Sequence, residues 1–291
     1  MYTISNAYLT VRVAAVGAEL CGLYAKTTQT EYMWQPGHET WDHSSLLLFP
    51  NPGRIAHDRT VIGGKVYPAM MHGFAGKMPF AVTEHTETRL TLELTANEYT
   101  RQYYPYAFRL VVEYILEGER LVQNIRVVNE DEKPVYYALG AHPAFYCPIR
   151  LNEPAENYRL TFDRPQNIRN MQMQENTRLV TGETTPWLTG SDTVALGDGF
   201  FNNGPMLLEG VDAATITLHS PVSGRFVEMG IEGFPNLCLW GAPTKMYLIA
   251  IEPWTGPSDR VDTNHVWEEK PGVQAVPVGQ TNTHTLTYRV G

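Results

Sequence analysis

Apolar and polar residues alternate with a period of two along most of this chain, which is the spacing of half-buried β-strands. The pattern is plain at residues 9–13 and at residues 108–116, where every second side chain is apolar. Two shorter arms at residues 60–67 flank Gly63-Gly64, which predicts a tight β-hairpin. Further strands are predicted at residues 31–34, 45–49, 90–94, 121–128, 158–162, 206–208, 215–219, 225–229, 237–240, 247–251 and 283–290.

The same pattern predicts the fold class. No long stretch shows helical periodicity, and 24 glycines with 20 prolines provide the breaks that many turns require. No shift in composition, linker or internal repeat divides the sequence. We therefore expect a single all-β domain over residues 1–291, built as a large antiparallel β-sandwich.

Composition and charge restrict the cellular location and the partners that we expect for this domain. With 43% apolar residues the chain is able to bury a large core, yet it has no apolar run of about 18 residues that would cross a membrane as a helix. The first residues lack the order of a secretory signal, and three widely spaced cysteines predict reduced thiols. A net charge of −9 argues against nucleic-acid binding. These features favour a cytoplasmic protein without nucleic-acid or membrane partners.

Three stretches place an acid/base side chain beside glycine or proline at an apolar run. They carry His72 in residues 71–75, His142 in residues 136–145 and Glu252 in residues 249–254. We expect Gly140 and Pro143 to end the strand around His142. Taken alone, such a histidine is more often a core residue bonded to a backbone carbonyl. Together, two histidines and a glutamate predict a proton-transfer site.

These motifs also resemble a known family. HGFA at residues 72–75, GAHPAF at 140–145 and EPW at 252–254 resemble the aldose 1-epimerase (galactose mutarotase-like) superfamily and occur in its order. Similar segments are GAEL at residues 17–20, PNPGRI at 50–55 and KPGV at 270–273, so that the likeness spans nearly the whole chain. The resemblance implies a β-supersandwich with an open carbohydrate cleft, and interconversion of sugar anomers without a cofactor.

The resemblance also implies roles for individual residues. The general base falls on Glu252, the general acid on His142 and the second active-site histidine on His72. A sugar-binding arginine falls on Arg54. Independently of the family, Trp254 and Trp34 are candidates to stack on the apolar face of a sugar ring, or are ordinary core residues.

The sequence departs from the family pattern at two positions. Gly76 stands where the family commonly has arginine, and Gly204 stands where it has a sugar-binding aspartate. Without that carboxylate we expect looser recognition of one sugar hydroxyl.

These considerations lead to one functional prediction and two alternatives. We predict an aldose 1-epimerase (a mutarotase, an isomerase of carbohydrate metabolism) that acts on a free hexose as a monomer or homodimer. No metal site or cofactor motif is predicted, because no HExxH, phosphate-binding loop or dinucleotide fingerprint occurs. A hexose-6-phosphate 1-epimerase is an alternative that requires basic residues near the pocket. A sugar-binding protein without turnover is the other.

Overall fold

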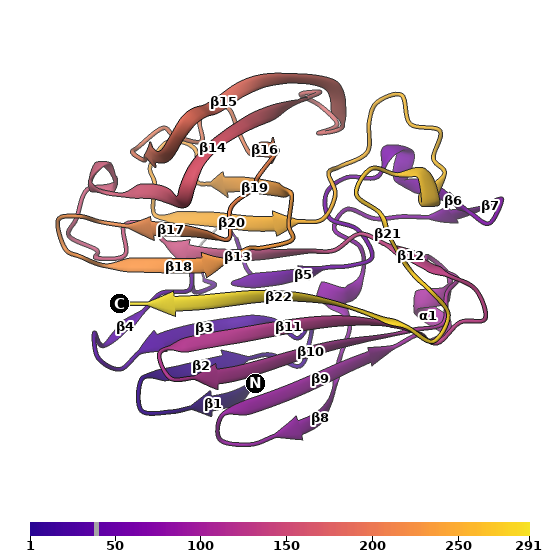
Figure 1. Ribbon diagram of the computed structural model, residues 1–291, viewed down its shortest axis with the longest axis horizontal. Helices are drawn as coiled ribbons and strands as arrows, with labels where there is room; N and C mark the ends of the chain where they lie inside the picture. The colour runs from indigo at the N-terminus through magenta and orange to yellow at the C-terminus, as the bar shows by residue number, and fades with distance from the viewer. Residues whose placement is uncertain (38–40) are drawn as a thin grey trace.

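The computed structural model describes residues 1–37 and 41–291, and antiparallel strands dominate it (Figure 1). Its helices are short: α1 spans Glu98–Arg101, and the four 3-10 helices span three residues each. None of the described helices is long or apolar enough to span a membrane. The strands are β1 Tyr2–Ser5, β2 Leu9–Val13, β3 Leu20–Ala25, β4 Thr30–Glu31, β5 Ser45–Leu48, β6 Arg59–Ile62, β7 Lys65–Pro68, β8 Ala81–His85, β9 Arg89–Thr95, β10 Phe108–Glu117, β11 Arg120–Asn129, β12 Val135–Tyr137, β13 Gly140–Tyr146, β14 Arg159–Met173, β15 Val180–Ala195, β16 Met206–Glu209, β17 Thr215–His219, β18 Phe226–Gly230, β19 Asn236–Gly241, β20 Leu248–Trp254, β21 Gln274–Val276 and β22 Thr281–Val290.

A fourteen-stranded sheet forms most of the described molecule. Its order is β5-β13-β20-β19-β16-β14-β17-β18-β22-β11-β10-β9-β8, with β15 paired to β14. Strand β14 is long enough to pair with β16 through residues 169–171 and with β17 through residues 159–162. A second sheet contains β1 to β4 in sequential order, and two smaller pairs are β12–β21 and β6–β7.

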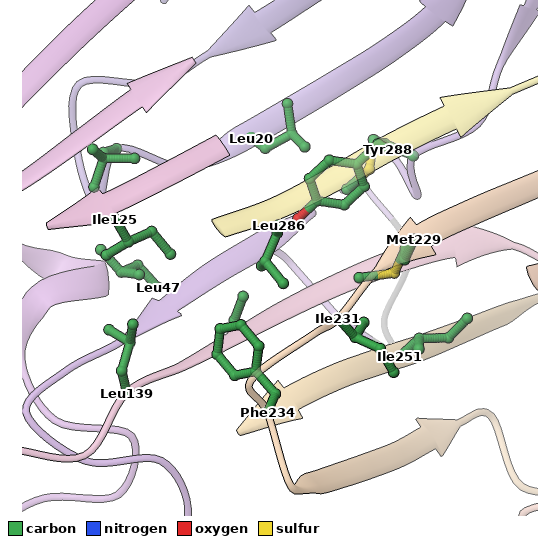
Figure 2. Close-up of a cluster of buried hydrophobic side chains, with 14 of the residues drawn as sticks. Leu20, Leu47, Ile125, Leu139, Met229, Ile231, Phe234, Ile251, Leu286 and Tyr288 are labelled. Carbon is green, nitrogen blue, oxygen red and sulfur yellow. The ribbon is translucent and has the colours of Figure 1, made fainter. Parts of the chain in front are cut away.

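The core lies between strands that are far apart in this order. Figure 2 shows Leu20 of β3, Ile251 of β20 and Leu286 of β22 together in one cluster of buried side chains. Strands from both ends of the large sheet and from the four-stranded sheet therefore bury the same apolar interior, as in a sandwich. The prediction of an all-β antiparallel fold is confirmed.

Strands β13, β19 and β20 are buried on both faces, so their sequences are nearly continuous apolar runs. Because side chains alternate along a strand, odd-numbered residues such as Phe145, Leu239 and Ile251 point into the core. Even-numbered residues, including His142 and Glu252, point to the other face. The main core thus supports a second, partly polar surface.

One local prediction was wrong. Strand β12 ends at Tyr137 and β13 begins at Gly140, but β13 does not stop at Pro143 and runs on to Tyr146. Pro143 is the last residue of β13 that pairs with β5. Proline has no N–H to donate, but at the limit of a ladder this missing donor interrupts no further pairing. His142 therefore lies inside a strand, with less freedom than a residue at its end.

A third histidine is buried away from that surface. The Nε2 atom of His284, on β22, lies 2.6 Å from the hydroxyl of Tyr137. Burial lowers the pKa of His284 to about 4. The folded protein therefore keeps this imidazole neutral at pH values where an unfolded chain already takes up a proton.

We expect His284→Gln to flatten the pH dependence of stability between pH 6.5 and about 4. As the pH is lowered, the unfolded chain binds the proton first. The wild-type free energy of unfolding therefore decreases as the pH is lowered through this window, by up to about 1.4 kcal/mol per pH unit from this group. Urea unfolding of both proteins at a series of pH values measures the two slopes. Parallel curves would show that His284 does not supply this dependence.

Candidate active site

The register of neighbouring strands builds the floor of a pocket. Gly140 pairs with Trp254, and Ala144 pairs with Ala250, so His142 of β13 stands opposite Glu252 of β20. Directly paired residues on adjacent strands have their side chains on the same face of a sheet.

The row continues on both sides of this pair. Leu46 of β5 pairs with His142, Cys238 of β19 pairs with Glu252, and Leu207 of β16 pairs with Cys238. All five side chains line one cavity of about 310 Å³. A single line of cross-strand neighbours therefore sets which groups face this cavity.

His142 and Glu252 are in contact at the centre of this row. The Nε2 atom of His142 lies 3.2 Å from the Oε1 atom of Glu252, and the two residues are only 8% and 1% exposed. Trp41 stacks on the imidazole with ring centres 4.4 Å apart. Within the described residues, neither His142 Nδ1 nor Glu252 Oε2 has a hydrogen-bond partner.

Burial controls the protonation of this pair. It raises the pKa of Glu252 well above its usual value, although the nearby Cys238 and Trp254 side chains act in the opposite direction. Burial, followed by the neighbouring His72, lowers the pKa of His142 well below 6.5. Both shifts favour uncharged groups, so a proton shared by the pair is favoured on Glu252 over His142.

His72 reaches the pocket from a loop whose close approach to Phe49 requires glycine at residue 73. His72 has φ 64° and Gly73 has φ 67°, and a Cβ on Gly73 would lie 2.2 Å from the Phe49 carbonyl oxygen. The backbone N–H of Gly53 donates to Nδ1 of His72 at 3.1 Å, so Nε2 carries the ring proton. Burial and then the charge of Arg54 lower the pKa of His72 to about 4, which keeps it a neutral donor.

The backbone of Arg54 is held by the loop that follows β20. Its N–H donates to the Ser258 hydroxyl at 3.0 Å, and its carbonyl accepts from the Asp259 N–H at 2.8 Å. Asp259 in turn forms a buried ion pair with Lys270 at 2.7 Å. The PNPGRI and KPGV segments of the sequence therefore meet beside the pocket.

Most of the predicted site residues come together. His72, His142, Glu252, Arg54 and Trp254 all line the cavity. Trp34 does not: it lines a separate cavity, where its indole N–H donates to the Trp41 carbonyl.

The sequence pattern did not indicate three prominent lining residues, Trp41, Arg178 and Trp240. The alternation of side chains could have indicated Trp240, because it lies two residues after Cys238 on a predicted strand and therefore on the same face as Cys238. Trp41 and Arg178 lie in loops, where alternation gives no signal.

The two departures from the family pattern have different surroundings. At Gly76, a Cβ would lie 3.0 Å from the side chain of Leu46, so an apolar residue lies against it. At Gly204, which has φ 83°, a Cβ would lie 2.9 Å from Nη1 of Arg178. The space beside Gly204 therefore contains a guanidinium group.

Known proteins resemble this chain over nearly its whole length. The plasmid and chromosomal LacX proteins of Lactococcus lactis subsp. lactis are each 31% identical over 280 residues, which cover 94% of this chain and 93% of theirs. A galactose mutarotase related enzyme from Lactobacillus acidophilus superposes with a TM-score of 0.93 at 27% identity, covering 100% of this chain and 97% of that one. A galactose mutarotase-like protein from Lactobacillus casei superposes with a TM-score of 0.91 at 27% identity, and both chains are covered fully.

The family comparison covers most of the sequence. The family model described as aldose 1-epimerase matches residues 1–269. The motifs, the antiparallel fold and this match agree, and the chain belongs to the aldose 1-epimerase family.

Proposed function

We propose that this protein is an aldose 1-epimerase that interconverts the α and β anomers of a hexose. The observation that carries the proposal is the contact between His142 and Glu252, 3.2 Å apart on the floor of a cavity. A cavity of about 310 Å³ with apolar walls and a few convergent polar groups suits a small ligand. The membership of the family supports an isomerase, and the site supports acid–base chemistry.

The reaction moves two protons around one carbon atom. Ring opening removes a proton from the C1 hydroxyl and adds one to the ring oxygen, while the C1–O5 bond breaks. The aldehyde then rotates about C1–C2, and closure on its other face reverses these transfers. Both oxygens are bonded to C1, so two groups in contact with each other are able to serve both.

A pair that holds one proton is sufficient for this cycle. With the proton on His142, the Glu252 carboxylate accepts the C1 hydroxyl proton and the imidazolium protonates the ring oxygen. The products of that step are a protonated Glu252 and a neutral His142, which are the forms that burial favours and that ring closure requires. In closure, His142 takes the proton back from the C5 hydroxyl and Glu252 returns its proton to the C1 oxygen, which restores the first arrangement. Transfer across the 3.2 Å contact connects that arrangement with the neutral pair before and after turnover.

Other lining groups would hold the sugar. The neutral His72 presents Nε2–H to the cavity and donates a hydrogen bond rather than a proton. Trp254 and Trp240 offer ring surfaces for the C–H side of a pyranose. Arg54 is a hydrogen-bond donor for sugar oxygens, fixed through its backbone by Ser258.

Glu252→Gln should lower kcat for anomer exchange by two to four orders of magnitude while leaving the fold intact, because it removes the titrating group and keeps its shape. Saturation-transfer NMR on glucose and galactose measures exchange between their anomeric protons at equilibrium. His142→Asn should cause a similar loss, mostly in kcat.

Glu113→Gln is the matched control, since Glu113 is also buried but pairs with Arg89 and Arg126 far from the cavity. It should retain wild-type turnover. Near-normal exchange in the Glu252 variant would remove the basis of this proposal.

A second expectation is that catalysis does not depend on a metal ion. Proton transfer by the His142–Glu252 pair needs no Lewis acid, so dialysis against a chelator should leave kcat/KM unchanged. The measurement is anomer exchange before and after dialysis, with each divalent ion then added back. Activity that disappears and returns with one ion would contradict this mechanism.

A further inference from the structure

The pocket contains a second arginine that the family pattern did not indicate. Arg178 lies in the turn between β14 and β15, which spans residues 174–179. The turn is closed by backbone bonds from Arg178 N–H to the Gln174 carbonyl and from Gln174 N–H to the Leu179 carbonyl. This hairpin turn brings a cationic side chain to the cavity.

Gly204 leaves room for that side chain. A Cβ at residue 204 would lie 2.9 Å from Nη1 and 3.3 Å from Nη2 of Arg178. Any residue with a side chain at position 204 would have to displace the guanidinium of Arg178. The guanidinium of Arg178 therefore occupies space that is open only because residue 204 is glycine. A cation lies at the position where the family pattern has a carboxylate.

Neither pocket arginine has a counter-charge in the described part of the chain. Seven other arginines form ion pairs with carboxylates, for example Arg89 with Glu113. Arg54 and Arg178 both line the cavity, and no ion pair or side-chain hydrogen bond of either is found among residues 1–37 and 41–291. Among residues 1–37 and 41–291, Glu252 is the one carboxyl group that lines the cavity, and burial raises its pKa well above the usual value, which favours its neutral form.

The local charge of the cavity is thus opposite to that of the whole chain, which is −9. Two guanidinium groups from different loops, neither with a carboxylate partner among the described residues, attract an anion. Guanidinium groups bind phosphate and carboxylate oxygens in a bidentate manner, which a neutral hydroxyl is unable to match.

We propose that the cavity is selective for an aldose that carries an anionic substituent, and that Arg178 binds this substituent. The inference rests on the proposed function, because it names the class of hexose that the His142–Glu252 pair would act on. The shared chemistry is that of a phosphate monoester or a sugar carboxylate. Arg178 acts as a specificity residue, and the proton transfers do not involve it.

The test compares glucose, glucose 6-phosphate and glucuronate by saturation-transfer NMR. In the wild type we expect kcat/KM for at least one anionic sugar to exceed that for glucose by 10-fold or more. Arg178→Gln should lower this value about 10- to 100-fold, mainly through KM, and change kcat/KM for glucose less than twofold. Arg178→Lys keeps the charge but loses the bidentate geometry, so it should retain an intermediate preference.

Arg289→Gln is the matched control for loss of one positive charge, because Arg289 pairs with Glu228 on β22 and β18, away from the cavity. It should leave the preference unchanged. Whichever of glucose 6-phosphate and glucuronate is preferred identifies the phosphate or the carboxylate as the recognised group. Equal kcat/KM for charged and neutral sugars, or equal losses for both in Arg178→Gln, would overturn the proposal.

A binding experiment separates this inference from the proposed function. Calorimetric titration of the Glu252→Gln protein with the same three sugars measures affinity without turnover. Tighter binding of an anionic sugar, weakened at least 10-fold by adding Arg178→Gln, supports the role of Arg178 even if no sugar is turned over. Equal affinity for glucose and both anionic sugars contradicts it even if free glucose is epimerised.

Discussion

The buried contact between a carboxyl group and an imidazole constrains the strands that carry them. An isolated charge at such a buried position is costly, but two groups that share one proton avoid that cost while remaining able to exchange it. His142 and Glu252 meet this condition because adjacent strands hold them opposite each other. A slip of one residue between β13 and β20 would point one of them into the apolar core. The contact between His142 and Glu252 therefore depends on strand register.

Much of this arrangement was accessible from sequence because it depends on local patterns. Alternation gave most strands of the large sheet, and the Gly-Gly pair gave the β6–β7 hairpin in the right place. The motifs around His72, His142 and Glu252 indicated the residues that line the cavity together. The resemblance added an order and a fold that no single motif would have given.

The structural features that were not predicted from the sequence have physical explanations. Strand β15 was missed because its side chains are mostly polar or exposed, and it is held by pairing with β14 rather than by burial. The extent of β13 was wrong because neighbours on both sides support a backbone that glycine and proline would interrupt in isolation. The position of Arg178 depends on two turns meeting in space, Gly204 in one and the end of β14 in the other. A contact between two turns does not appear in the periodicity of the sequence.

The site therefore has two parts with different freedom to vary. Its floor is formed by paired strands above the main core, where a change in one side chain affects its neighbours in the row. Its rim is formed by loops and hairpin turns, which tolerate substitution more readily. Substitutions in the rim are therefore able to change the shape and charge of the cavity while the paired strands of its floor stay in place.

The position of β22 has a consequence for how the protein is made. This strand contains residues 281–290, yet it lies between β18 and β11 in the interior of the large sheet (Figure 1). During synthesis, the strands on either side of that gap emerge from the ribosome long before the segment that joins them. Their edges then present unpaired backbone groups, which are prone to pairing with other chains. Deletion of residues 281–290 would leave the facing edges of β18 and β11 unpaired and so lower the solubility of the protein.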